Sequence, residues 1–73
     1  MVQEKIIAII AEKLEVSAKD ITAASSFDDM KVDSLAMVEI MLALEEEYGI
    51  TIDEAEGIET VADITAYVEQ KLT

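Results

Sequence analysis

Ser34 is the residue of this chain that is best placed to do chemistry, in the triplet Asp33-Ser34-Leu35. It follows a loop and stands at the predicted start of an amphipathic helix, where a short side chain points into water. A serine that attacks a substrate needs a general base, usually a histidine, and the chain has no histidine. Cysteine and arginine are also absent, and no G-x-S-x-G turn surrounds Ser34. We therefore expect no catalytic residue and no enzymatic activity of the chain's own.

Two other roles remain for Ser34. Serine and aspartate both favour the position that caps a helix start, so Ser34 and Asp33 are both candidates for the cap, and from the residues alone capping is the simpler interpretation. The alternative is that another enzyme modifies Ser34, because a phosphate at a helix start meets free backbone N–H groups and the positive end of the helix dipole. Asp33 opposes such a phosphate electrostatically, which suggests that Asp33 serves an incoming enzyme or its metal.

The charge of the chain restricts its partners. Seventeen acidic residues stand against five basic ones, which gives a net charge of −12. Nucleic acid is excluded as a partner, because binding to phosphates requires a basic surface. Between Val32 and Gln70 there is no basic residue at all. Such a surface either keeps a small protein soluble or meets a basic surface on a partner.

Length and composition predict one small domain, 1–73. We also expect a monomer. Without cysteine there is no disulfide or thiolate metal site, and we expect no metal ligands in the chain. The longest apolar run, 6–11, is too short to span a membrane. The start of the chain lacks a signal-peptide pattern, so we expect a cytoplasmic protein that does not bind membranes.

The hydrophobic spacing predicts an all-α fold, a small four-helix bundle with three main helices and a short third helix. The first helix covers about 2–15, and the second covers 34–48. A long loop at about 22–32 joins them, with Phe27 as its anchor in the core. The short third helix falls at 53–56, and Thr60 caps the last helix.

The predicted helix 34–48 is apolar over more than one stripe. The inward stripe consists of Ile40, Met41, Leu44 and Tyr48. A second stripe consists of Leu35, Val38 and Leu42. Either the first and last helices cover this second stripe, or it forms an exposed apolar strip flanked by Glu39, Glu45 and Glu46. An apolar centre with a charged rim is typical of a transient binding site.

Nearly the whole chain resembles the acyl carrier proteins. The specific part of the resemblance is Asp33-Ser34-Leu35 together with Val38-Glu39 and the segment Ala43-Leu44-Glu45-Glu46-Glu47. The resemblance implies that Ser34 takes 4′-phosphopantetheine from coenzyme A, and that the terminal thiol of this arm carries acyl intermediates as thioesters. It also implies a role in fatty-acid or polyketide-type biosynthesis as a carrier that other enzymes modify and use.

The resemblance implies the partners as well. They are a phosphopantetheinyl transferase and the acyl-transferring and chain-elongating enzymes, which have basic surface patches. The residues that match the family's partner-recognition surface are Asp33, Leu35, Val38, Glu39, Leu42, Glu45 and Glu46.

The chain departs from the family pattern at several positions. Lys31 and Val32 stand where the commonest motif has glycine and alanine, and Ala36 replaces an acidic residue of many bacterial members. The segment 53–58 is shorter than in the typical fatty-acid carrier and lacks its proline. These differences leave the attachment of the arm intact and leave the subclass of carrier open.

Two alternatives to a fatty-acid or polyketide carrier are considered. The first is a dedicated carrier for an amino acid or a special acyl group. The second, of a different class, is an acidic module that binds calcium or a helix, because Asp28, Asp29, Asp33 and Glu39 superficially resemble a calcium loop. The EF-hand pattern requires a ligand at its third position, where Met30 stands, and a central glycine, which is missing.

Overall fold

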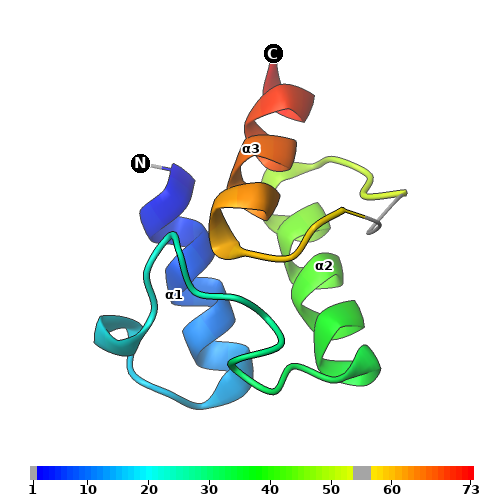
Figure 1. Cartoon of the computed structure of the whole chain (residues 1–73). Helices are drawn as coiled ribbons and strands as arrows, with labels where there is room; N and C mark the ends of the chain where they lie inside the picture. Colours follow the sequence, from blue (N-terminus) through cyan, green and yellow to red (C-terminus); the bar gives the residue numbers. More distant parts are fainter. Residues whose placement is uncertain (1, 54–56) are drawn as a thin grey trace.

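A computed structural model of the chain describes residues 2–53 and 57–73. The elements in order are α1 (Val2–Leu14), the 3₁₀ turn η1 (Ala18–Asp20), α2 (Ser34–Tyr48) and α3 (Val61–Leu72), as Figure 1 shows. The predicted all-α fold with three main helices is confirmed. The predicted short helix at 53–56 falls almost entirely on 54–56, which lie outside the described residues. No helix in the described part of the chain is long and apolar enough to cross a membrane.

The helix ends follow the local signals in the sequence. Gly49 ends α2 with φ 64°, a left-handed conformation that glycine adopts without steric cost. At the start of α3 the Thr60 side chain accepts from the Asp63 N–H, and the Asp63 carboxylate accepts from the Thr60 N–H. The predicted cap at Thr60 is therefore confirmed, and Asp63 completes a reciprocal capping box. Ser17 caps the short turn η1: its hydroxyl accepts from the Lys19 N–H, and its carbonyl accepts from the Asp20 N–H.

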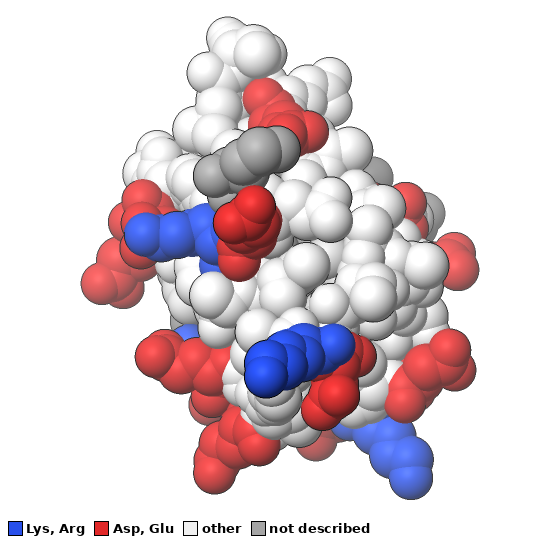
Figure 2. All heavy atoms as spheres, turned by 90° about the vertical axis from the view of Figure 1, so that its left-hand side faces the viewer, with Lys and Arg blue, Asp and Glu red and all other residues white. Residues whose placement is uncertain are grey.

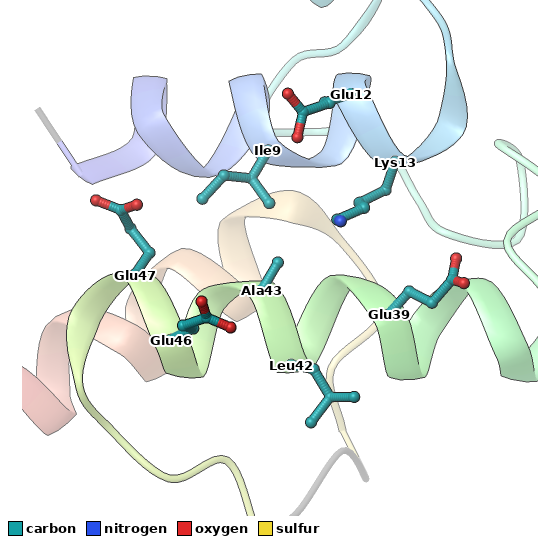
Figure 3. A pocket seen from close by; sticks show the side chains of 8 residues that line it. All are labelled: Ile9, Glu12, Lys13, Glu39, Leu42, Ala43, Glu46 and Glu47. Carbon is teal, nitrogen blue, oxygen red and sulfur yellow. The ribbon is translucent and has the colours of Figure 1, made fainter.

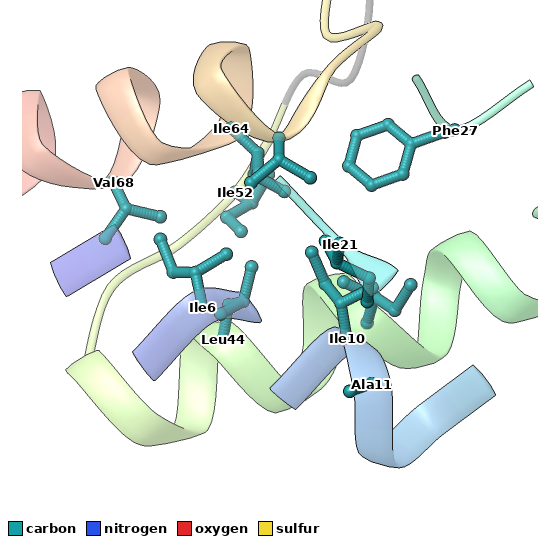
Figure 4. Close-up of a cluster of buried hydrophobic side chains, with 11 residues drawn as sticks. Ile6, Ile10, Ala11, Ile21, Phe27, Leu44, Ile52, Ile64 and Val68 are labelled. Carbon is teal, nitrogen blue, oxygen red and sulfur yellow. The ribbon is translucent and has the colours of Figure 1, made fainter. Parts of the chain in front are cut away.

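The core forms where α1 packs against both α2 and α3. Figure 4 shows how these helices direct aliphatic side chains into one cluster. Seven of these side chains are fully buried: Ile6, Ile10, Ile40, Leu44, Val61, Ile64 and Val68. Full burial of one such side chain contributes about 1.5–3 kcal/mol. The cluster therefore holds α2 on the scaffold through one face, with Ile40 and Leu44 as its anchors.

The loop between η1 and α2 is tied to the start of α3. Phe27 is 6% exposed, which confirms it as the anchor of the loop (Figure 4). Its backbone N–H donates to the Glu59 carbonyl at 2.9 Å, and Ser26 and Thr60 form an isolated antiparallel bridge. The Val61 N–H donates in return to the Ser25 carbonyl at 3.0 Å. These bonds hold the residues before α2 in one place.

Candidate functional site

Of the two candidates for the cap of α2, the structure selects Asp33. The Asp33 Oδ1 atom accepts from the Ala36 N–H at 2.8 Å, so Asp33 is the N-cap of α2. Asp33 therefore has a structural task of its own, beyond the service to an enzyme or metal that we expected. Ser34 is the first residue of the helix and is exposed. Within the described residues its hydroxyl takes part in no hydrogen bond, so it is free to react.

A tight turn directs the chain into α2. The Lys31 N–H donates to the Asp28 carbonyl and the Val32 N–H donates to the Phe27 carbonyl, both at 3.0 Å. Lys31 has φ 58°, a left-handed conformation that costs a residue with a Cβ about 1–2 kcal/mol. Glycine, which the family pattern has at this position, would adopt it freely. The turn is thus kept in this chain by its hydrogen bonds and by the buried Phe27.

A small recess of about 260 Å³ opens beside Ser34. Its walls are mostly apolar, and its lining residues are Phe27, Val32, Asp33, Ser34, Met37 and Ile58. Neither Met37 nor Ile58 is among the site residues predicted from the sequence. Ile58 reaches the recess because the loop pairs with the residues before α3, and this pairing leaves no local signal in the sequence.

The second apolar stripe of α2 is a surface feature. Leu35, Val38 and Leu42 are 69%, 45% and 57% exposed, so neither α1 nor α3 covers them. Glu39 and Glu46 are exposed beside this stripe. Of the two interpretations left open by the spacing, the exposed strip with acidic neighbours is the one that the structure shows.

Glu45 differs from the other acidic residues of α2. It is only partly exposed, and its Oε2 atom accepts from the Ile52 N–H at 2.7 Å. The bond ties the chain after Gly49 back onto the helix. Glu45 therefore braces the end of α2, a role that its position in the predicted partner surface did not reveal.

Two carboxylates with lowered pKa values lie in or against α3, away from Ser34. Hydrogen bonds from the Glu59 and Thr60 N–H groups hold the pKa of Asp63 below its ordinary value of 3.8. The Tyr67 hydroxyl donates to Asp53 at 2.8 Å and lowers its pKa, with Lys71 nearby as a further cause. Both pKa shifts arise from hydrogen bonds that stabilise α3 and its contacts.

A phosphodiester on Ser34 fits its surroundings. The oxygen points into solvent at the positive end of the helix dipole, and the recess beside it has room for the first atoms of an attached arm. The Asp33 carboxylate opposes the phosphate charge, but its Oδ1 atom is engaged by the Ala36 N–H. Across the described residues, no three acidic side chains are grouped so that they could hold a metal ion, so the calcium-module interpretation finds no support in the geometry.

Comparison with known proteins identifies the family. A profile described as the phosphopantetheine attachment site matches residues 4–68. Acyl carrier proteins of Rickettsia canadensis, Rickettsia rickettsii and Rickettsia typhi are each 45% identical to the chain. Each comparison covers 96% of this chain and 85% of the relative. The chain therefore belongs to the acyl carrier protein family, whose members are non-enzymatic carriers with a phosphopantetheine attachment site.

Proposed function

We propose that Ser34 is the residue that receives the phosphopantetheine arm. The observation that carries this proposal is the free, exposed hydroxyl of Ser34 beside a neighbour, Asp33, that supplies the helix cap. The arm ends in a thiol, which holds acyl groups as thioesters and which the cysteine-free chain cannot supply itself.

The loading step requires a separate enzyme. The Ser34 oxygen forms a new bond to the phosphorus that bears the pantetheine, and the bond from this phosphorus to the nucleotide part of coenzyme A breaks. The serine proton passes to a base of the transferase, because the chain has no histidine near Ser34 to accept it. The chain's own contribution is to hold the hydroxyl in the open, at a fixed point of the scaffold.

The carrier serves fatty-acid biosynthesis in this proposal, as a single carrier domain. The similarity to relatives named acyl carrier protein supports this role, and the chain covers 85% of each relative's length. Polyketide-type synthesis uses the same arm chemistry. The acyl groups found on the protein in its host would distinguish the two pathways, because straight saturated chains of graded length indicate fatty-acid elongation.

The partner surface in this proposal is the exposed side of α2. The apolar contacts are Leu35, Val38 and Leu42, and the acidic neighbours include Glu39 and Glu46. The partners are a phosphopantetheinyl transferase and acyl-handling enzymes with basic patches. Exposed charges mainly set the association rate, and salt screens them.

Loading in vitro tests the attachment site. Incubation with coenzyme A and a broadly specific phosphopantetheinyl transferase should add one arm to the natural chain and none to Ser34→Ala. Ser17→Ala is the matched control, because Ser17 is another exposed serine that caps a turn far from Ser34 along the chain. Modification of Ser34→Ala, or loss of modification in Ser17→Ala, would refute the assignment.

Kinetics of the same reaction test the surface. Glu39→Lys should raise the KM for the carrier several-fold at low salt and leave kcat nearly unchanged, and added salt should reduce the difference. Glu69→Lys on α3 makes the same charge change at an exposed position outside this surface. Equal effects of the two variants would show that only total charge matters.

A further inference from the structure

A groove of about 570 Å³ lies between α1 and α2, and Figure 3 shows the side chains that line it. Ile9, Glu12 and Lys13 reach it from α1. The two helices run antiparallel beside it, and the Lys5 Nζ atom lies 3.3 Å from a Glu47 carboxylate oxygen at one end. The groove shares no lining residue with the recess beside Ser34.

The rim of the groove is acidic and its floor is apolar. Four glutamates and one lysine line it. Glu47 has Lys5 as its ion-pair partner, whereas Glu12, Glu39 and Glu46 are exposed and form no ion pair within the described residues. Partly buried Ile9 and Ala43 make the floor, and Leu42, which is 57% exposed, borders it. Figure 2 shows one face of the molecule, over which acidic side chains are spread among a few lysines.

We propose that this α1–α2 groove docks a basic amphipathic segment of a partner protein. Arginine or lysine head groups would meet Glu12, Glu39 and Glu46, and aliphatic side chains would pack on Ile9 and Leu42. The inference rests on the proposed function, because the groove shares Glu39, Leu42 and Glu46 with the partner surface of α2. It extends that surface across the groove to α1, where neither the motif nor the spacing placed a binding residue.

The chemistry of the groove favours this occupant over others. A second copy of the chain also has a charge of −12, so two copies repel each other. A fatty chain would leave the rim carboxylates without partners and would lie in an open groove. A small inorganic cation would leave the apolar floor unused. Only a segment that combines positive charge with aliphatic side chains uses both parts of the groove.

A peptide titration tests the proposal with the arm-loaded protein. The probe is a synthetic helical peptide that presents arginine and leucine on one face, and its control has glutamine in place of arginine. Glu12→Gln should weaken binding of the arginine peptide about two- to five-fold, as expected for one exposed charge pair. Lys13→Gln should strengthen binding by a similar factor, because it removes the positive charge that competes for the same rim.

Two matched variants control for overall charge. Glu4→Gln removes an exposed glutamate of α1 that does not line the groove, and Lys19→Gln removes an exposed lysine of η1. Both should leave the dissociation constant within the error of the natural chain. Backbone amide shifts on titration should be largest at Ile9, Glu12 and Ala43.

The outcomes separate this inference from the proposed function. Equal effects of Glu12→Gln and Glu4→Gln would show diffuse attraction and overturn the docking groove, as would amide shifts confined to the start of α2. Loading of Ser34 in the Glu12→Gln variant would still proceed in that case, so the carrier assignment would stand. Loss of loading in Ser34→Ala tests the carrier assignment independently of the peptide.

Discussion

Asp33 and Ser34 show how two adjacent polar residues share the start of a helix. Both residue types favour the cap, and the sequence alone did not decide between them. The geometry decides it, because only Asp33 accepts from the Ala36 N–H. The exposure of Ser34 was predictable from its place before an amphipathic run. Its freedom from hydrogen bonds was not, since that depends on which neighbour turns its side chain toward the helix.

Lys31 offers a test of the turn before the site. Lys31→Gly should raise the free energy of unfolding by about 0.5–1 kcal/mol, because relief of the left-handed strain exceeds the added entropy of the unfolded chain. Lys19→Gly removes the same charge at a residue without positive φ and should destabilise. Urea denaturation of both variants measures the effect. A loss of stability in Lys31→Gly would mean that the lysine side chain contributes more than the strain costs.

The lowered pKa of Asp63 predicts how the stability of the fold depends on pH. Its pKa is lower in the folded chain than its ordinary value of 3.8, so its stabilising contribution is present above that value and is lost as the pH falls through the folded pKa. The stability difference between the natural chain and Asp63→Asn should therefore be full at neutral pH and shrink below pH 3.8. Glu69→Gln controls for the loss of one carboxylate on α3. A difference that widens on acidification would contradict the capping role of the charged form.

At the scale of elements, the helices were predictable and their connections were only partly so. Hydrophobic periodicity predicted α2, and Thr60 was correctly predicted as the cap of the last helix, α3. The pairing of Ser26 with Thr60 was not predictable, because a single bridge between distant segments has no local pattern. The same holds for the bond from the Ile52 N–H to Glu45, which depends on how the chain returns after Gly49.

Glu45, a residue of the predicted partner surface, should therefore also stabilise the fold. Glu45→Ala should lower the free energy of unfolding by about 1–2 kcal/mol, since the N–H of buried Ile52 loses its acceptor. Glu46→Ala is the matched control, because Glu46 is the next residue and is exposed. Thermal melts compare the two. Equal melting temperatures for the two variants would show that water replaces the carboxylate without cost.

At the scale of the whole molecule, repulsion between acidic side chains opposes folding. Seventeen acidic residues surround a small core formed by three helices, and folding brings like charges closer than they are in the extended chain. The composition predicted this acidity. The sequence did not show that glutamates of α1 and α2 converge on one groove, because that follows from how the two helices pack.

The effect of magnesium on the melting temperature tests whether repulsion between acidic side chains limits the stability of the fold. Added magnesium should raise the melting temperature by screening the acidic surface, and sodium chloride at equal ionic strength should do so less. A variant in which Glu39, Glu46 and Glu47 are all replaced by glutamine should gain less from magnesium than the natural chain. A melting temperature that does not change with either salt would show that repulsion does not limit stability.

The most direct test of the carrier assignment is the mass of the protein purified from its own host. Fragmentation of the intact protein should locate a phosphopantetheine group, free or with an acyl group on its thiol, on Ser34. The adjacent Asp33 and Leu35 should have their unmodified masses. A chain that carries no such group under growth conditions, or carries it on a residue other than Ser34, would contradict the assignment.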